Sequence, residues 1–290
     1  MIVITGATGR LGGAVVERLL DRVPAAEVGV AVRDASRATH LADRGVRVRE
    51  ADFAAPETLP HAFDGATQVL VVSGPADAEL HRPVLRAAVA AGAERVLYTS
   101  HQAADPASAF AATVEHARTE RDLAEAGVAY TALRNGYYAV SAIQLMGQAL
   151  TSGRLVLPED GPASWTAHAD LADAAVVALT GPGRLDGVTP PLTGPELLDF
   201  EQLAAIASEV TGREIEYVRV PDDEWLAGAR ASGMTEELSR FFLGIFVAAR
   251  RGEFAVLDPT LEQLVGRRPA TFRDVLASTL DAAPRPAGRG

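Results

Sequence analysis

The chain has 290 residues, of which 48% are hydrophobic, and it carries a formal net charge of −11 at pH 7. This length and composition predict one large domain or two closely packed ones, and the negative charge argues against nucleic acid as a partner. The sequence has no cysteine and no lysine, which excludes disulfides, thiolate metal sites, Schiff-base lysine chemistry and the Walker A phosphate loop.

The sequence pattern also bears on location. Ile2 to Ile4 already form a strand pattern, so we expect no secretory signal, and no apolar run is long enough to span a membrane. The six histidines are dispersed, so we expect no metal site. We therefore expect a cytoplasmic protein that binds neither membrane nor nucleic acid.

The first half of the chain alternates short apolar runs with helical segments, which predicts a doubly wound parallel sheet of the Rossmann type, an α/β fold. The expected helices cover residues 11–20, 83–91 and 112–126, where apolar side chains recur with helical spacing. The expected strands are residues 1–5, 28–33, 46–51, 67–74, 95–100 and 128–134.

The second half is less regular and richer in aromatic residues, as expected of a portion that covers a substrate. We predict a nucleotide-binding core over residues 1–135 and a smaller, mostly helical substrate-binding portion over 136–283, with segments near 165–195 returning to the core. The expected helices are 200–211, 222–232, 235–250 and 270–281, and residues 284–290 are expected to form a disordered tail.

A glycine-rich turn follows the first strand directly and opens the first helix. Gly6, Gly9 and Gly12 are spaced three residues apart, which allows a tight turn and a close approach of a pyrophosphate to the backbone. Thr8 and Arg10 add candidate phosphate contacts. A glycine turn without a ligand is the alternative, but the surrounding strand and helix pattern favours dinucleotide binding.

Arg33 follows the second strand, where this fold places the adenosine ribose. Arginine pairs with a 2′-phosphate, so NADP(H) is favoured over NAD(H). Asp34 leaves an alternative open, because a carboxylate binds a ribose hydroxyl and an Arg-Asp turn can also simply face solvent. Arg37 either assists Arg33 or faces solvent.

Several motifs together resemble one family. ITGATGRLG, AVRD, EADF, YTS and LRNGYY are similar to the NmrA-like, atypical short-chain dehydrogenase/reductases. LRNGYY and LEQLVGRRPATF resemble, more narrowly, bacterial NAD(P)H:quinone oxidoreductases of type 2, and the similarity extends from residue 1 to about residue 280. It implies an NADPH-dependent oxidoreductase with a small aromatic or quinone substrate, and it is compatible with a homodimer.

The resemblance also implies residue roles along the carboxyl ends of the strands. The pyrophosphate would be lined by Gly6, Thr8, Gly9, Arg10 and Leu11, with Arg33 at the 2′-phosphate. The remaining implied cofactor contacts are Asp52 and Phe53 at the adenine, Ser73 and Gly74 beside the ribose, and Thr99, Ser100 and His101 near the nicotinamide ribose. Each also has a purely structural interpretation as a turn, cap or strand residue.

The sequence departs from active short-chain dehydrogenases at the Tyr-x-x-x-Lys pair. The corresponding helix has His116 and Glu120 at that spacing, a replacement that the quinone-reductase subgroup shares. Hydride transfer to a quinone does not need a tyrosinate, because the acceptor is strong and the product takes its proton from water or a weak acid. Alcohol dehydrogenation, epimerisation and dehydration by the usual route are disfavoured.

The candidate catalytic residues are Asn135, Tyr137, His101 and His116. Asn135 is a candidate ligand for the carboxamide or a quinone oxygen, Tyr137 for stacking or proton donation, and the histidines for proton donation. His168 stands where relatives often have arginine. Trp165, Phe242 and Phe246 either wall an aromatic pocket or belong to the core.

Two other functions remain as alternatives to the quinone reductase. One is a redox-sensing regulator of the NmrA type, which binds the dinucleotide without turning it over. The other is a specialised ketoreductase or isomerase of secondary metabolism with a narrow substrate. All three use the same glycine loop, so the loop does not discriminate among them.

Overall fold

The computed structural model describes residues 1–181 and 183–282, so the predicted tail at 284–290 lies outside the described residues. The chain forms two compact units, and neither is continuous in sequence. Unit 1 consists of Met1–Gly136, His168–Leu192 and Asp258–Arg267, and unit 2 consists of Tyr137–Ala167, Thr193–Leu257 and the chain from Arg268. The substrate-binding role predicted for residues 136–283 stays a prediction.

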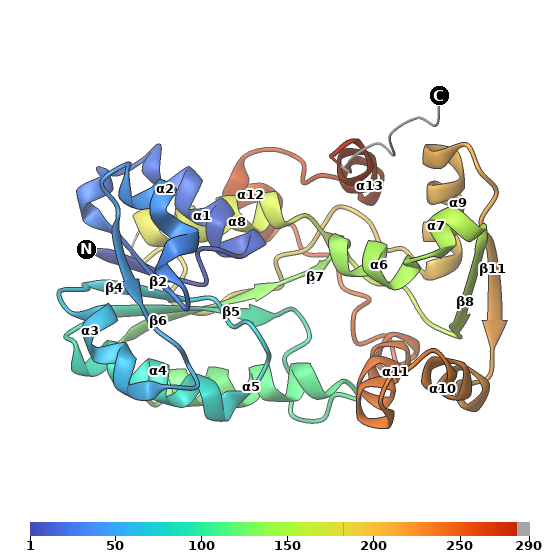
Figure 1. The fold of residues 1–290 in the computed structure, drawn as a ribbon, viewed down its shortest axis with the longest axis horizontal. Helices are drawn as coiled ribbons and strands as arrows, with labels where there is room; N and C mark the ends of the chain where they lie inside the picture. Colours follow the sequence, from blue (N-terminus) through green and yellow to red (C-terminus); the bar gives the residue numbers. More distant parts are fainter. Residues whose placement is uncertain (182, 283–290) are drawn as a thin grey trace. The chain divides into compact units, whose positions relative to one another are not determined.

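Unit 1 is built on a seven-stranded sheet with the order β10-β6-β5-β4-β1-β2-β3, and every pair of neighbouring strands is parallel (Figure 1). This confirms the predicted doubly wound parallel sheet. The strands are β1 (Ile2–Thr5), β2 (Val28–Val32), β3 (Arg47–Glu50), β4 (Gln68–Val71), β5 (Arg95–His101), β6 (Ala129–Asn135) and β10 (Gly187–Val188).

The central strands are apolar because helices cover both faces of the sheet. All residues of β1 and β2 are buried, and Ile4 pairs in register with Val30 on one side and Leu70 on the other. The strand order reverses between β1 and β4, and parallel sheets bind ligands outside the carboxyl ends of the strands at such a point. This edge of unit 1 is therefore the place to look for a site.

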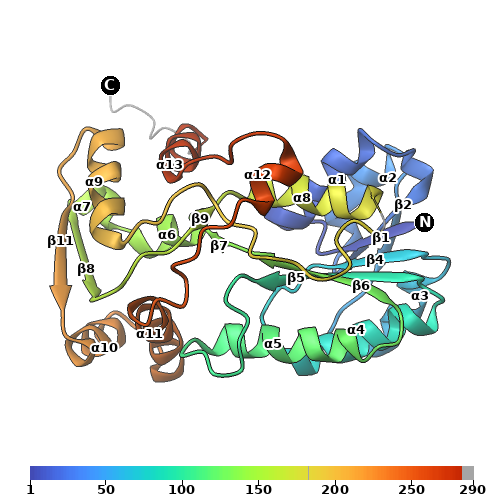
Figure 2. The same ribbon diagram turned by 180° about the vertical axis from the view of Figure 1, so that it is seen from behind.

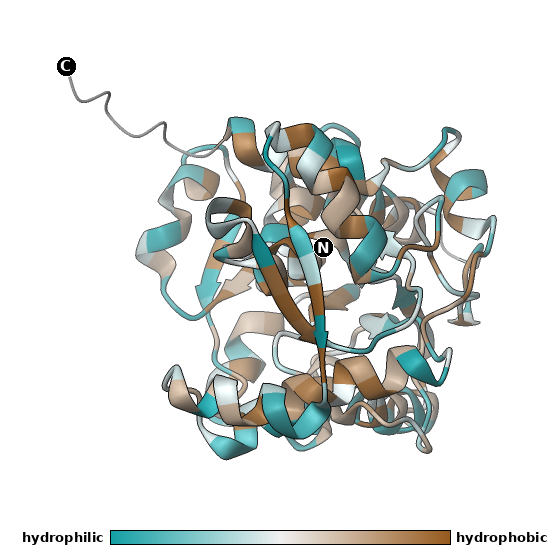
Figure 3. Cartoon of the chain, turned by 90° about the vertical axis from the view of Figure 1, so that its right-hand side faces the viewer, coloured by the Kyte–Doolittle hydropathy of each residue, from teal (hydrophilic) through white to brown (hydrophobic). Residues whose placement is uncertain are grey.

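Helices of unit 1 lie on both faces of its sheet, with α1, α8 and α12 on one and α3, α4 and α5 on the other (Figures 1 and 2). Hydrophilic and hydrophobic residues alternate along the helices, as expected of helices that bury one side (Figure 3). The helices are α1 (Arg10–Leu20), α2 (Thr39–Ala42), α3 (Leu59–Phe63), α4 (Ala78–Ala90), α5 (Ala111–Ala124), α8 (His168–Thr180) and α12 (Thr260–Val265), with 3-10 turns η1 (Ala25–Glu27), η2 (Ala35–Ala38) and η3 (Pro56–Thr58).

Helix α4 begins five residues earlier than the predicted start at Pro83. Asp77 caps it, because the carboxylate accepts hydrogen bonds from the amides of Glu79 (2.9 Å) and Leu80 (3.4 Å). Pro83 lies inside the helix. The prediction placed proline at the start, where its missing N–H costs nothing, but the Asp77 cap starts the helix earlier.

A late segment of the chain completes the helical layer of unit 1. Helix α12 ends at Gly266, which adopts a left-handed conformation (φ 71°). Arg267 then binds Asp170 and Asp173 of α8 at 2.6 and 2.7 Å, and Asp173 also pairs with Arg18 of α1. The arginine of the VGR motif thus links α12, α8 and α1.

Unit 2 contains two small parallel sheets, β7 with β9 and β8 with β11, and an aromatic core. Trp165 contacts Phe200 edge-to-face, Phe200 contacts Phe246, and all three are buried. The strands are β7 (Tyr137–Tyr138), β8 (Arg154–Pro158), β9 (Trp165–Thr166) and β11 (Glu216–Val220), and the helices are α6 (Ala139–Met146), α7 (Ala149–Ser152), α9 (Phe200–Thr211), α10 (Asp222–Ala231), α11 (Glu236–Arg250) and α13 (Phe272–Asp281).

Candidate functional site

The turn between β1 and α1 requires glycine for two different reasons. Gly6 has a φ of +62°, the left-handed region that favours glycine. Gly12 packs so closely on the turn that a Cβ atom there would lie 2.3 Å from the carbonyl oxygen of Gly6. The amide of Gly9 donates to the same carbonyl at 2.9 Å. The backbone of the turn is therefore drawn tightly around the start of α1.

The N-terminus of α1 is suited to an anion. Gly9 is its N-cap, no side chain caps the helix, and no acidic residue lies in the first turn. Thr8 and Arg10 are exposed, whereas Leu11 is buried under the turn. Arg10 forms no ion pair with any residue the structure describes. Free first-turn amides, the positive end of the helix dipole and an unpaired arginine together favour phosphate.

The end of β2 separates the roles of Arg33 and Asp34. The Asp34 carboxylate accepts hydrogen bonds from the amide (3.0 Å) and hydroxyl (2.6 Å) of Ser36, and these bonds lower its pKa. It therefore caps η2. Arg33 is exposed and has no ion-pair partner within the described residues. The local turn occupies the carboxylate and leaves the guanidinium available.

The turn after β3 carries Asp52 and Phe53. The Asp52 carboxylate accepts from the amide of Ala54 at 3.0 Å, and its own amide donates to the Thr58 hydroxyl at 3.0 Å. Phe53 is half-buried and lies edge-to-face with His81 of α4, with ring centroids 6.3 Å apart. Both residues are thus fixed in a well-bonded turn at the carboxyl edge of the sheet.

Hydroxyl groups at the ends of β4 and β5 are bonded within the protein. The Thr99 hydroxyl oxygen accepts from the amide of Ser73 (2.9 Å) and donates to the Ser73 hydroxyl (3.3 Å). The Ser100 hydroxyl donates to the carboxylate of Glu120 at 2.6 Å. Gly74 has a φ of +61°, and a Cβ atom there would meet nothing within 4 Å. The chain therefore presents open space at Gly74.

Asn135 ends β6 and holds a buried polar atom that the protein leaves unbonded. The residue is 2% exposed, and none of the described residues bonds its Oδ1 atom. Its backbone carbonyl accepts from the amide of Gln102, and the following amide, of Gly136, donates to Leu192. A buried amide oxygen without a donor is costly, so a bound group with an N–H at this position would be stabilised.

His101 and His116 lie together beside the ends of β5 and β6. Their rings stack with centroids 6.0 Å apart, and His101 pairs in register with Asn135. Burial lowers the pKa of His101 to about 3, assisted by the charge of Arg134, and burial also lowers the pKa of His116 well below its usual value. Both histidines are therefore neutral at pH 7.

Helix α5 also carries a buried carboxylate that pairs with an arginine of β6. Glu120 is buried and accepts from Arg134 Nε (2.9 Å) and Arg134 Nη2 (2.7 Å), as well as from the hydroxyl of Ser100. Hydrogen bonding to Glu120 raises the pKa of Arg134. Arg134, whose charge lowers the pKa of His101, is thus bonded to Glu120 through its guanidinium.

The other candidate side chains fall in different surroundings. His168 begins α8 in unit 1, and its burial, with the charge of Arg10, lowers its pKa to about 4. Tyr137 belongs to unit 2, where it lies edge-to-face with Trp165 and Phe254, and burial raises its pKa. Trp165 and Phe246 are core residues of that unit, and Phe242 is half-buried.

Sequence reasoning missed three residues that organise the histidines. His81 of α4 and Tyr98 of β5 are fully buried and hydrogen-bonded, and Arg134 neutralises Glu120. A signal existed for His81, because it occupies the apolar stripe of its helix. No helix within the described ranges is long and apolar enough to cross a membrane, and no group of side chains there could hold a metal ion.

Known proteins resemble this chain over almost its full length. The model of the NmrA-like family matches residues 1–263. Quinone oxidoreductase 2 of Escherichia coli strain K12 is 33% identical over 278 residues, which cover 94% of this chain and 96% of that protein. The structure of the Escherichia coli NADPH-dependent quinone oxidoreductase QOR2 complexed with NADPH has a TM-score of 0.89 at 31% identity, covering 97% of this chain and 100% of that chain.

A second solved structure is similar to nearly the same degree. The triphenylmethane reductase of Citrobacter sp., complexed with NADP(H), has a TM-score of 0.86 at 30% identity. The likeness covers 96% of this chain and 99% of that chain.

Proposed function

The chain belongs to the NmrA-like family, and from this premise we propose that it is an NADPH-dependent oxidoreductase that reduces quinones or similarly conjugated acceptors. The observation that carries the proposal is the buried Glu120 carboxylate bonded by Arg134 and Ser100, which we infer to stand where a catalytic lysine would otherwise act. Arg134 engages this carboxylate, and neutral His101 and His116 are weak acids, so the site suits an acceptor that takes hydride readily and is protonated afterwards.

The residues of unit 1 fit a dinucleotide. Gly6, Gly9 and Gly12 let the pyrophosphate approach the amides at the start of α1, and Thr8 and Arg10 extend from the same turn. At the other end of the cofactor, the unbonded Oδ1 of Asn135 would accept from a carboxamide N–H. The remaining contacts of the proposal are Leu11 beneath the pyrophosphate, Asp52 and Phe53 at the adenine, and Ser73, Gly74, Thr99, Ser100 and His101 along the ribose and nicotinamide.

Preference for NADPH over NADH rests on the end of β2. Arg33 is exposed and unpaired within the described part of the chain, so it is available to a 2′-phosphate. The Asp34 carboxylate is held by Ser36, which removes the group that would otherwise bind a 2′-hydroxyl. In this proposal Asp34 has the turn role that was the alternative for the Arg-Asp pair, and Arg33 binds the cofactor.

The reaction we propose consumes one NADPH, one quinone and one proton and yields NADP⁺ and the hydroquinone. The bound cofactor supplies the hydride. The chain's own contribution is to orient the nicotinamide through Asn135, to exclude water and to stabilise the charge on the acceptor oxygen. The proton comes from solvent, because neutral His101 and His116 are weak acids and burial raises the pKa of Tyr137.

The test is oxidation of NADPH, and separately of NADH, followed by absorbance with a panel of benzoquinones, naphthoquinones and one triphenylmethane dye. We expect quinone-dependent oxidation of NADPH with a higher kcat/KM than for NADH. Tight binding of NADPH without oxidation by any acceptor would contradict the proposal and favour a redox-sensing role. A strict requirement for a single ketone substrate would favour the specialised ketoreductase.

A further inference from the structure

We propose that Tyr98, a fully buried residue of β5, fixes His116 as a neutral hydrogen-bond donor whose Nε2–H group faces the oxygen of the bound acceptor. The contact with the acceptor oxygen rests on the proposed function, whereas the position of the proton on His116 depends only on residues of this protein. Tyr98 is a positioning residue in this scheme, because it acts through His116. The chemical class it serves is a conjugated carbonyl whose oxygen becomes negative on hydride addition.

The proton positions in the cluster follow from His81. Its Nε2 atom lies 2.8 Å from the backbone carbonyl oxygen of Ser73, which can only accept, so Nε2 carries the proton. In the neutral ring, Nδ1 of His81 must then accept a hydrogen bond. The Thr119 hydroxyl lies 2.9 Å from this atom and 3.1 Å from the carbonyl oxygen of Glu115, whereas the Tyr98 hydroxyl lies 3.4 Å from Nδ1. The shortest of these contacts assigns the Thr119 proton to Nδ1 of His81.

This arrangement directs the hydroxyl of Tyr98 to His116. The Tyr98 oxygen lies 2.7 Å from Nδ1 of His116. Because Thr119 serves Nδ1 of His81, the phenol donates this short hydrogen bond in the proposed arrangement. With Nδ1 accepting, the single proton of the neutral imidazole must reside on Nε2. His116 therefore offers an N–H group rather than a lone pair at its other nitrogen.

The surroundings keep the cluster neutral. Burial lowers the pKa of both His81 and His116, and the neighbouring His101 opposes a charge on His116 further. The charged groups that face the cluster are Asp77 and Glu115, which act on His81, and Arg134, which acts on His101. A neutral imidazole is a suitable donor to an oxyanion, because it stabilises the developing charge without having to be protonated first.

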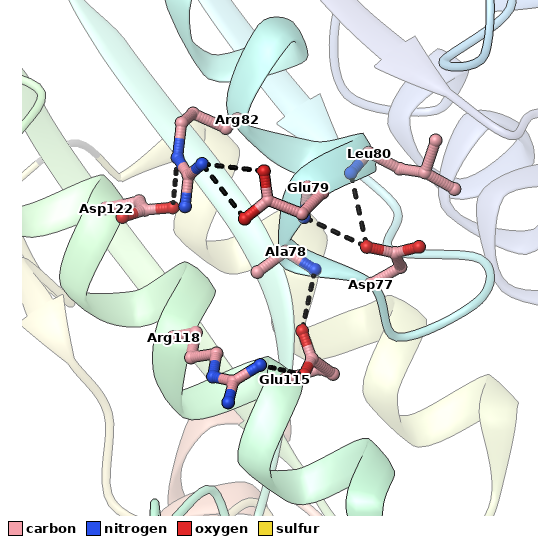
Figure 4. Close-up of polar contacts among 8 residues, drawn as sticks. All are labelled: Asp77, Ala78, Glu79, Leu80, Arg82, Glu115, Arg118 and Asp122. Atoms are coloured by element: carbon pink, nitrogen blue, oxygen red, sulfur yellow. Dashed lines mark hydrogen bonds and ion pairs between the residues drawn. The ribbon is translucent and has the colours of Figure 1, made fainter.

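Helix α4, which carries His81, and helix α5, which carries His116, are also joined by polar contacts outside the cluster (Figure 4). The Glu115 carboxylate of α5 accepts from the amide of Ala78 at the start of α4, at 3.1 Å. One turn further along, Arg82 of α4 binds Asp122 of α5 at 3.0 Å. His81 and His116 are thus held on helices that do not shift independently.

The ring of His116 also lies at the carboxyl edge of the unit 1 sheet, where the proposed cofactor site is. It stacks on His101, whose register partner is Asn135, the proposed carboxamide ligand. A donor beside these two residues is near the nicotinamide end of the proposed cofactor site. Hydride leaves this end of the cofactor, so the acceptor oxygen gains its charge here.

The experiment measures the tautomer of His116 directly in the full chain. Protein labelled with ¹⁵N in its histidine rings gives two-bond ¹H–¹⁵N correlations that distinguish Nδ1–H from Nε2–H, and the His116→Gln spectrum identifies the His116 signals. We expect Nε2–H in the wild type. Finding wild-type His116 as the Nδ1–H tautomer, or as a cation at pH 7, would overturn the proposal.

The second half of the experiment is Tyr98→Phe, which removes one oxygen and keeps the ring. We expect the Nδ1–H tautomer to appear and kcat with a quinone to fall about tenfold at unchanged KM for NADPH. The control is Thr113→Val in α5. It removes a buried hydroxyl that lies outside the cluster and donates to the backbone carbonyl of Phe110. It should leave both readouts unchanged.

The outcomes separate the two proposals. An unchanged tautomer and kcat in a folded Tyr98→Phe protein would refute the positioning role. A wild type that has the expected tautomer but oxidises no NADPH would instead refute the proposed function. A loss of kcat in Thr113→Val as large as in Tyr98→Phe would show that the effect is structural.

Discussion

Two stretches of the carboxyl edge of the unit 1 sheet differ in how far their polar groups are exposed and paired. The arginine side, at the ends of β1 and β2, carries exposed Arg10 and Arg33 without partners among the described residues. The histidine side, at the ends of β5 and β6, carries His101, His116 and Asn135 among buried and mostly paired polar groups. Charge recognition thus remains open to solvent, whereas the proposed reaction site is kept neutral. The predictions below test this contrast, beginning with the largest expected effect.

The arginine side depends most on Gly12. A Cβ atom at this position would overlap the carbonyl of Gly6 at 2.3 Å, so Gly12→Ala must displace the turn from the start of α1. We expect NADPH binding to fall below detection, measured by quenching of tryptophan fluorescence or by calorimetry. Gly228→Ala is the control, because a Cβ atom there meets nothing within 4 Å. Retained NADPH binding in Gly12→Ala would contradict the phosphate-loop assignment.

The histidine side depends on the pair of Glu120 and Arg134 for its stability. Glu120→Gln leaves Arg134 without its buried counter-charge, and the free energy of unfolding should fall by about 3 kcal/mol. Urea unfolding measures this change. The exposed pair of Glu236 and Arg240 is the comparison, and Glu236→Gln should cause no measurable loss of stability. Equal losses would show that Glu120 behaves as a surface group.

The neutrality of the histidine side predicts acid sensitivity. Histidine in the unfolded chain titrates near 6.5, whereas His101 titrates at about 3 in the folded protein. The unfolded state therefore binds more protons between these values, and stability falls as pH falls through this window. From pH 7 to pH 5, His101 should contribute a loss of about 2 kcal/mol.

Urea unfolding at the two pH values measures this contribution. His101→Asn should reduce the difference between pH 7 and pH 5 by about 2 kcal/mol. Exposed His40 provides the matched variant, and His40→Asn should leave the difference unchanged. If His101→Asn keeps the wild-type pH dependence, His101 is protonated in the folded state and the contrast between the two sides fails.

The smallest effect concerns cofactor choice on the arginine side. Arg33→Ala should raise the Kd for NADPH about tenfold, equivalent to about 1.4 kcal/mol, and leave the Kd for NADH within twofold. Arg22→Ala removes an equally exposed arginine elsewhere and should change neither constant. Equal losses for both cofactors would mean that Arg33 does not recognise the 2′-phosphate.

The sequence predicted the central strands well because they are buried on both faces and flanked by turns. All residues of β2, for example, are apolar or glycine, and its predicted position at 28–33 differs by one residue from the observed strand. The short strand β10 was missed, because two residues carry no periodic signal. The early start of α4 was missed because Asp77 acts through a cap, which the apolar pattern does not report.

The sequence could point to those candidate residues whose role depends on a glycine backbone conformation or on an exposed charged side chain. Gly6 stands out because glycine tolerates a positive φ, and Arg33 stands out because its guanidinium can bind a phosphate. The roles of Tyr98 and Arg134 could not be predicted, because they arise from pairings between β5, β6 and the helices on one face of the sheet. Such pairings join residues that are far apart in the sequence.

The link that Arg267 makes with α8 and α1 has a consequence for synthesis of the protein. Unit 1 contains residues as late as 267, so its helical layer is incomplete while most of the chain is already made. At synthesis rates of roughly 5–20 residues per second, tens of seconds pass between the emergence of the glycine turn and that of Arg267. During this interval Asp170, which the finished fold buries, waits for its counter-charge. The nascent protein therefore passes through a period in which α8 lacks the ion pairs that Arg267 later supplies.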